Sequence, residues 1–321
     1  MYNAENFIDN TIKSILLQTF EDFELIIVDD KSTDRSIQIV ESFKDPRIKI
    51  VQSVKNSHEW NARNLGLQIA SGEYVYFVDH DDMLIPQALE ILWRAVEKSD
   101  ADSIHFNSYY TNVDNRFSLQ EVQVIQIVDS MPPDRFLPED VEWRLLQKEF
   151  SLSVMAWQKI CRREFLIEHG IYFPPLWISS DSMHFFAELC LARKIFVIEN
   201  AGYIYRQNLS SQMRIDAIQK LRHVTENFKP MLDFMEETFS KNLISPISRE
   251  SQIRAEIERA DIICMKFAAE AYKSGIPLET INSILDEQIR NGFMLNPESI
   301  RMLFHLGIEG YISRKSESQI K

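Results

Sequence analysis

Apolar and polar residues alternate along the first hundred positions with two distinct periods. Apolar residues at helical spacing from Phe7 to Leu16 give way to a continuous apolar run from Phe23 to Val28. The pattern then predicts a helix from the cap residues 32–34 to 43, a strand over 48–51, a helix over 60–70, a strand over 73–78 and a helix over 86–98. Such alternation is typical of a doubly wound α/β domain with crossover helices.

The later part of the chain has a different pattern. A strand is expected over 103–110, followed by a mixed stretch and then by strands over 195–198 and 203–205. From Ile215 onward the pattern is helical, with breaks expected at Pro230, Pro246, Pro277 and Pro297. We therefore predict one α/β domain over 1–212, with halves over about 1–110 and 111–212, and a helical region over 213–321.

The apolar run from Tyr74 to Val78 ends abruptly in three carboxylates, those of Asp79, Asp81 and Asp82. Such a run predicts a strand buried on both faces of a parallel sheet, and ligands bind at the carboxyl ends of such strands. Carboxylates this close repel one another, and a hard divalent cation such as Mg²⁺ or Mn²⁺ offsets the repulsion while it binds substrate phosphates. The alternative is a solvated acidic turn that caps the helix starting near Pro86.

Composition narrows the class of protein. The 321 residues are 45% hydrophobic and 26% charged, which is typical of a globular protein with a substantial core. A formal net charge of -13 argues against a nucleic-acid-binding surface, because such a surface needs clustered Lys and Arg. The three cysteines lie far apart, and no apolar run is long enough to span a bilayer. We expect a cytoplasmic protein, with peripheral association at the inner face of the plasma membrane as its only membrane contact.

Several spaced motifs together resemble a known enzyme family. They follow the family's order at 2–5, 14–19, 24–34, 62–67, 70–74 and 79–82, and then at Trp157–Lys159, Phe173–Pro174, Asp181, Tyr205–Arg206 and Ser211. The chain resembles a family 2 glycosyltransferase with the GT-A fold, and its later motifs resemble bacterial capsule and exopolysaccharide members. The resemblance implies a Rossmann-like, doubly wound mixed sheet, followed here by a helical C-terminal extension.

The resemblance also implies which residues bind the nucleotide of a UDP-sugar. In this family the aspartate at the position of Asp30 hydrogen-bonds the uracil ring, and Tyr2 would stack near the base. Arg63 would contact the ribose or the diphosphate. Each residue has a plainer alternative: a loop carboxylate that caps the next helix for Asp30, an exposed terminal aromatic for Tyr2 and a solvated charge for Arg63.

The acidic cluster matches the family's DXD motif. The resemblance assigns Asp79 and Asp81 to donor binding, and it assigns Asp81 and Asp82 to a divalent cation, Mn²⁺ or Mg²⁺, that neutralises charge on the departing nucleoside diphosphate. Arg206 occupies the position of an arginine near the diphosphate. His80 fills the variable position of the motif and is not expected to bind the metal.

Asp181 occupies the position of the family's catalytic base. In inverting transfer the acceptor hydroxyl attacks the anomeric carbon opposite the leaving group, and a carboxylate on that face takes the hydroxyl proton. Capsule-type relatives have Glu-Asp where this chain has Ser180-Asp181. The alternative role for Asp181 is a helix N-cap, and His184 would lie on the same helical face, where it either orients Asp181 or packs.

These assignments predict an inverting, metal-dependent transfer of sugar from a UDP-sugar to a polysaccharide or lipid-linked glycan acceptor. The alternatives are a non-catalytic relative that binds a nucleotide sugar and, more weakly, nucleotidyl transfer. Relatives begin with an apolar strand immediately before Tyr2, and this strand lies between those that end at Asp30 and Asp79. Without it we expect a truncated copy with weak activity, and a gap of about 9–10 Å with no ladder between those two strands.

Overall fold

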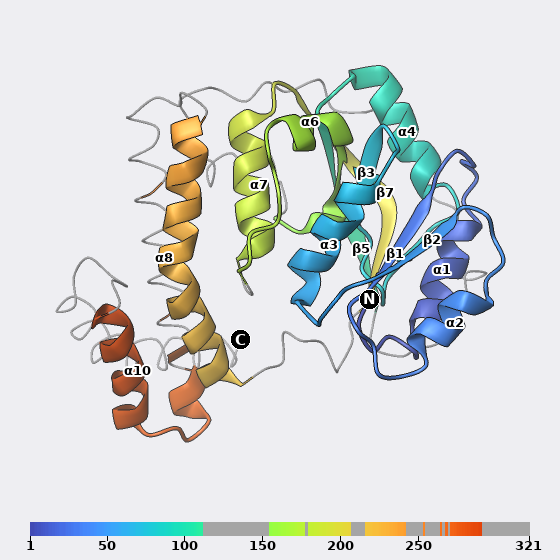
Figure 1. Cartoon of the computed structure of the whole chain (residues 1–321). Helices are drawn as coiled ribbons and strands as arrows, with labels where there is room; N and C mark the ends of the chain where they lie inside the picture. The colour runs from blue at the N-terminus through green and yellow to red at the C-terminus, as the bar shows by residue number, and fades with distance from the viewer. Residues whose placement is uncertain are drawn as a thin grey trace, which may run out of the picture. The chain divides into compact units, whose positions relative to one another are not determined.

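The computed structural model describes residues 1–111, 154–176, 179–206, 216–241 and 270–290, together with residues 253, 264, 267 and 268 (Figure 1). The chain divides into two compact units. One unit comprises residues 1–175 and 180–211, and the other comprises residues 176–179 and 212–321. Each unit is described by itself.

The N-terminal unit starts with a two-stranded parallel sheet. Its elements are α1 (Ile8–Leu16), β1 (Leu25–Asp29), α2 (Ser36–Ser42), β2 (Ile48–Gln52) and α3 (His58–Ile69). β1 and β2 pair from Leu25 opposite Ile48 to Asp29 opposite Gln52. The apolar faces of α1 and α2 bury a small core against β1, formed by Ala4, Ile8, Ile12, Ile27 and Val40. The helical and strand periods of the sequence therefore give the expected elements here.

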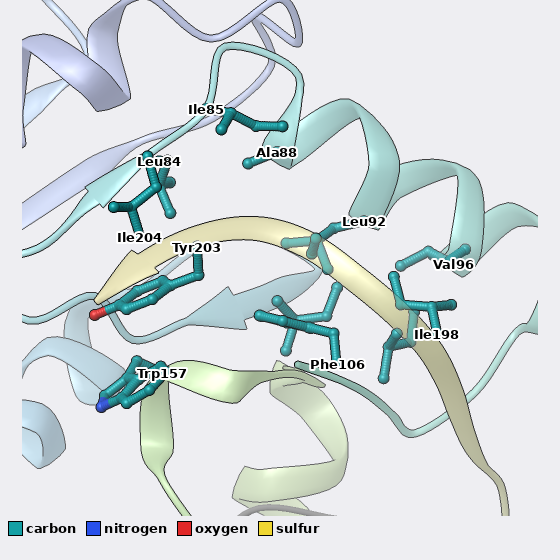
Figure 2. Packing of buried hydrophobic residues seen from close by; sticks show 14 of the residues in the cluster. Leu84, Ile85, Ala88, Leu92, Val96, Phe106, Trp157, Ile198, Tyr203 and Ile204 are labelled. Carbon is teal, nitrogen blue, oxygen red and sulfur yellow. The ribbon is translucent and has the colours of Figure 1, made fainter. Parts of the chain in front are cut away.

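A five-stranded mixed sheet forms the rest of this unit. Its elements are β3 (Tyr74–Tyr76), β4 (Met83–Leu84), α4 (Ala88–Ser99), β5 (Ser103–Thr111), the 3₁₀ turn η1 (Ala156–Gln158), β6 (Lys159–Arg162), α6 (Arg163–Glu168), α7 (Ser180–Leu191) and β7 (Ile195–Arg206). The strand order is β3-β6-β5-β7-β4, and β5 and β7 are its parallel pair. α4 packs Leu92 and Val96 into the core beside Phe106 and Ile198 (Figure 2). The mixed α/β architecture confirms the predicted fold class.

Two strands differ from the sequence prediction. β3 covers only three residues, is half-buried and pairs antiparallel with β6, so the prediction of a strand buried on both faces of a parallel sheet was wrong. Among the described residues β3 has a hydrogen-bonded neighbour on one side only, which leaves it partly exposed. The two short strands expected near residues 195 and 205 form one strand, β7, with Gly202 at φ +78° inside it. A Cβ atom on Gly202 would lie 2.2 Å from Ile85, so glycine allows β4 to approach.

No ladder joins β1 to β3 in the described part of the chain, as the sequence predicts: β1 pairs with β2, and β3 pairs with β6. Residue 1 lies beside the end of β1. The Met1 nitrogen donates to the Val28 carbonyl at 2.5 Å, and the Asp30 N–H donates to the Met1 carbonyl at 2.8 Å. These two bonds have the pattern of a parallel pair, so Met1 fixes the end of β1 that carries Asp29 and Asp30. The predicted spacing of the two strands stays a prediction.

The C-terminal unit is helical where the structure describes it. α8 (Ala217–Lys241) continues through Pro230, so the break expected there was wrong. Pro230 is exposed, and the buried side chains of Phe228 and Met231 beside it keep the helix packed despite the lost hydrogen bond. α10 (Leu278–Arg290) starts directly after Pro277 and contacts α8. Pro246 and Pro297 lie outside the described residues, and no helix in the described ranges is long and apolar enough to cross a membrane.

Candidate active site

The acidic cluster lies in the short connection between β3 and β4, and Asp82 is its fully buried member. Its Oδ2 accepts a hydrogen bond from the Tyr203 hydroxyl at 2.5 Å, and its Oδ1 accepts one from the Arg206 N–H at 2.7 Å. Burial, together with the charges of Asp79 and Asp81, raises the pKa of Asp82 to about 8, although the two hydrogen bonds oppose this. Both oxygens of Asp82 therefore hold the acidic connection against β7.

An aromatic stack aims the Tyr203 hydroxyl at this cluster. The Trp157 ring lies parallel to the Tyr203 ring, with centroids 4.5 Å apart (Figure 2). The same indole ring also stacks on Tyr205, with centroids 5.2 Å apart. The Tyr203 hydroxyl accepts a hydrogen bond from the Asp79 N–H at 3.3 Å in addition to the bond that it donates to Asp82. The stack therefore links η1 and β7 to the backbone of the DXD motif.

Two polar residues of α1, and one just beyond its end, hold the other side of the acidic connection. The Thr11 hydroxyl lies 2.9 Å from the His80 carbonyl and 2.8 Å from the Asp82 carbonyl. Ser14 Oγ accepts from the Leu84 N–H, and Gln18 donates to the Ile85 carbonyl. Thr11 and Ser14 share one face of α1, because they are three positions apart, and the Gln18 side chain returns to this face by donating to the Ser14 carbonyl at 2.9 Å. Sequence reasoning missed this support, although polar residues at that spacing on a buried helical face were a visible signal.

Arg63 of α3 joins the acidic cluster to the predicted base. One terminal nitrogen donates to Asp181 Oδ1 at 2.5 Å and the other donates to Asp79 Oδ1 at 3.1 Å. The Arg63 side chain is only 12% exposed, so it is no solvated surface charge. Burial alone would lower the pKa of Arg63, but Asp181 and Asp79 outweigh burial and raise it, so the guanidinium stays charged.

Asp181 lies in the first turn of α7 and is held from two sides. Its Oδ1 accepts from Arg63, and its Oδ2 accepts from the Ala156 N–H at 3.2 Å. The carboxylate is 23% exposed, and each oxygen can accept a second hydrogen bond. The geometry therefore leaves Asp181 open to a hydroxyl group from solvent.

The Phe173 segment supports both Arg63 and α7. The Arg63 guanidinium lies 5.3 Å from the Phe173 ring centroid, and the His184 ring stacks on the same phenyl group at 4.1 Å. The side chain of Asn64 accepts from the Phe173 N–H and donates to its carbonyl, at 2.9 and 2.8 Å. One helical turn before Arg63, burial together with the charges of Asp181 and Asp79 raises the pKa of Glu59, against the effect of Arg63. The sequence analysis did not include Glu59 among the site residues, although its pKa responds to the charges of the site.

The edge predicted to bind the base contains Asp30, at the end of β1, and Tyr2. The Asp30 carboxylate is 3% exposed and accepts from the Ser57 N–H at 3.0 and 3.2 Å, whereas Asp34, not Asp30, accepts from the first N–H of α2. Tyr2 is 37% exposed. Three non-glycine residues with positive φ border this edge: Asn3, Lys31 and His58. Such strained conformations persist mainly at functional sites, which supports a ligand-binding role for this edge.

Arg206 at the end of β7 closes the site. Its Nε donates to the Asp81 carbonyl at 2.8 Å, and its guanidinium lies 5.4 Å from the Phe7 ring centroid. Ser211 lies outside the described residues.

Within the described ranges no three acidic, histidine or cysteine side chains are clustered as a ready metal site. The carboxylates of the connection between β3 and β4 fit a hard cation that takes one or two carboxylates and completes its shell with substrate phosphates.

His184 makes the stability of this unit depend on pH. Burial and the nearby Lys159 lower the pKa of His184 to about 3. The unfolded chain binds this proton near pH 6.5, so stability contributed by His184 is lost as the pH falls from about 6.5 toward 3. We expect His184→Phe to remove about 2 kcal/mol of the stability difference between pH 7 and pH 5, measured by urea unfolding. His169→Gln, which changes an exposed histidine, is the control. If the unfolding free energy of His184→Phe depended on pH as it does in the wild type, His184 would not be the source of this pH dependence.

Comparison with known proteins shows which enzyme family the N-terminal part of the chain matches. Residues 1–155 match the model of glycosyl transferase family 2. The match covers just under half of the chain, and together with the mixed α/β fold it identifies a family 2 glycosyltransferase region in residues 1–155.

Relatives and solved structures agree with this class. The chain is 28% identical to glycosyltransferase GlyG of Streptococcus pneumoniae, over 67% of this chain and 71% of that one. It is 27% identical to the poly(ribitol-phosphate) beta-N-acetylglucosaminyltransferase TarS of Staphylococcus aureus, over 92% of this chain and 44% of TarS. The crystal structure of TarS 1–349 with UDP aligns with a TM-score of 0.56 and 21% identity, over 85% of this chain and 70% of that chain. A Pyrobaculum calidifontis mannosyltransferase with GDP-Man and Mn²⁺ aligns with a TM-score of 0.53 and 15% identity, over 95% and 81%.

Proposed function

We propose that this protein is an inverting, metal-dependent glycosyltransferase that moves a sugar from a UDP-sugar to a polysaccharide or lipid-linked glycan. The match of residues 1–155 to the family model supports sugar transfer. The TarS structures with UDP and with UDP-GlcNAc support UDP as the nucleotide, and the name of TarS supports a polymeric acceptor. Acceptor binding at the inner face of the plasma membrane is part of the same proposal.

The observation that carries the proposal is the Arg63 bridge. It joins Asp79, in the predicted donor motif, and Asp181, the predicted base, through the two terminal nitrogens of one guanidinium group, although they are 102 positions apart in the sequence. A transferase needs its donor phosphates and its base on either side of the anomeric carbon. A protein that only binds a nucleotide has no need for the second carboxylate.

We assign separate roles to the residues around the bridge. Asp30 and Tyr2 hold the base, and Arg63 and Arg206 bind the anionic diphosphate. Asp181 accepts the proton of the acceptor hydroxyl as its oxygen attacks the anomeric carbon. The diphosphate would then compete with Asp181 for the guanidinium nitrogens of Arg63, which also binds Asp79.

We assign the cation to Asp81, with Asp79 binding the donor beside it. A divalent ion there supplies positive charge to the leaving nucleoside diphosphate. Mn²⁺ in the mannosyltransferase structure supports a cation at this kind of site. Asp82 was predicted as a second ligand, but its oxygens already accept from Tyr203 and Arg206. We therefore propose that Asp82 positions Asp81 and binds no metal.

The test is a release assay with the purified protein and a panel of UDP-sugars and GDP-mannose, with and without Mn²⁺. We expect release of UDP from one donor, at a rate that EDTA abolishes and a lipid-linked glycan acceptor increases. Binding of a UDP-sugar with no release would identify a non-catalytic relative. Release of pyrophosphate from a nucleoside triphosphate would instead identify a nucleotidyltransferase, and either result would overturn the proposal.

A further inference from the structure

One face of α7 carries three ionisable residues that run from the candidate active site into the core. Asp181, His184 and Glu188 are three and four positions apart, so they share a helical face. Asp181 is partly exposed, whereas His184 and Glu188 are both 0% exposed. The proposed chemistry uses only the first of them.

Glu188 is the centre of a buried charge cluster. Its Oε1 lies 2.6 Å from His105 Nε2 of β5, and its Oε2 lies 3.1 Å from the Lys159 ammonium of β6. The same ammonium lies 4.5 Å from the Phe185 ring centroid, so Lys159 contacts α7 at two side chains. Burial alone would raise the pKa of Glu188, but Lys159 and His105 outweigh it and bring the pKa below the usual range. Glu188 is therefore a carboxylate that pairs with a buried cation.

This cluster is a poor device for stability alone. A buried ion pair loses so much hydration that apolar side chains of similar volume often stabilise a fold as well or better. Its advantage is that it specifies how α7 is placed, because the charges pair in only one arrangement of α7 against β6. Since Lys159 and Glu188 are each at most 1% exposed, solvent does not weaken that preference.

The cluster and the predicted base connect the same two segments. Ala156 donates to Asp181, and three positions later Lys159 pairs with Glu188. Along α7 the two contacts are about 10 Å apart, seven residues at 1.5 Å each. Two contacts at that separation fix both the rotation and the axial position of the helix. A single contact would leave α7 free to turn about it.

We propose that Lys159 and Glu188, with His105, are positioning residues that hold α7 so that Asp181 meets Arg63 and the acceptor hydroxyl. The inference rests on the proposed function. It predicts that loosening the buried pair lowers turnover without changing donor binding, because Asp30, Asp79 and Arg206 lie on other elements.

The decisive variant removes both charges and keeps both volumes: Lys159→Met with Glu188→Gln. Glu188→Gln alone would leave the Lys159 ammonium buried and unpaired, and it is expected to destabilise the fold. For the double variant we expect kcat to fall by roughly tenfold to a hundredfold, since a misplacement of about 1 Å has effects of that size. We expect KM for the UDP-sugar and Kd for UDP to stay within about twofold.

A second measurement separates positioning from a general loss of structure. If the pair acts through Asp181, the same double substitution in an Asp181→Asn background changes the residual rate less than about twofold. The matched control is Lys229→Met with Asp233→Asn, an exposed pair on α8 that should leave kcat unchanged. A folded double variant with wild-type kcat, or an equal fall in the Asp181→Asn background, would overturn the proposal.

Two further arms keep the test decisive. If the double variant does not fold, Glu188→Asp retains both charges and shortens the contact by one methylene, and the same criteria apply to it. If the wild-type protein turns over no donor, the proposed function fails and amide hydrogen exchange judges the positioning instead. Exchange of residues 180–185 should then rise in the variant while that of 88–99 stays constant, and unchanged exchange at both would contradict the inference.

Discussion

Asp181→Asn is expected to lower the transfer rate by roughly two to four orders of magnitude while UDP still binds. The amide is nearly the same size as the carboxylate, and its single oxygen can still accept from either Arg63 or Ala156. It cannot take a proton from the acceptor hydroxyl as readily, so the chemical step loses its base. UDP should bind at least as tightly as in the wild type, because Arg63 loses one of the two anions that hold it.

The measurement pairs single-turnover kinetics with calorimetric titration of UDP. Asp233→Asn makes the same chemical change at an exposed site on α8 and should leave both values unchanged. Wild-type turnover in Asp181→Asn would mean that another group, or none, accepts the proton. A loss of UDP binding equal to the loss of turnover would instead make Asp181 a donor-binding residue.

Local patterns predicted the first five elements of the N-terminal unit. α1, β1, α2, β2 and α3 follow from apolar periodicity and cap residues, which depend on neighbours in the sequence. The character of β3 did not follow, because its partner β6 lies more than eighty positions away, and burial depends on that pairing. The helix break predicted at Pro230 was wrong for a similar reason, because the packing of neighbouring side chains outweighs the helix-breaking preference of one residue.

The candidate site divides in the same way. Motif spacing singled out Asp79, Asp81, Asp181 and Arg63, and the structure brings Arg63 into contact with Asp79 and Asp181; their roles stay predictions. Their supports were not predictable from motifs. Glu188, Lys159 and His105 are scattered single residues whose importance appears only when α7, β6 and β5 meet in the core.

Asp81→Ala is expected to abolish the metal-dependent part of UDP binding while the protein stays folded. Asp82 makes the hydrogen bonds to Tyr203 and β7, and Thr11 holds the backbone of the same connection, so the loop keeps its anchors without the Asp81 side chain. Removing one carboxylate also relieves repulsion within the cluster. Loss of the cation should therefore be separable from loss of structure.

The measurement is the ratio of UDP affinities with Mn²⁺ and with EDTA, compared between wild type and variant. Wild type should bind UDP much more tightly with Mn²⁺, and Asp81→Ala should bind it equally weakly in both conditions. Asp9→Ala is the matched control, because it removes an exposed carboxylate paired with Lys13 on α1 and should keep the wild-type ratio. Asp82→Asn separates the two aspartates: with a pKa of about 8 the Asp82 carboxyl is largely protonated at neutral pH, so the amide is a close substitute and should keep the fold and the wild-type Mn²⁺ ratio. A wild-type Mn²⁺ ratio in Asp81→Ala, with the ratio lost in a fully stable Asp82→Asn, would assign the cation to Asp82 instead.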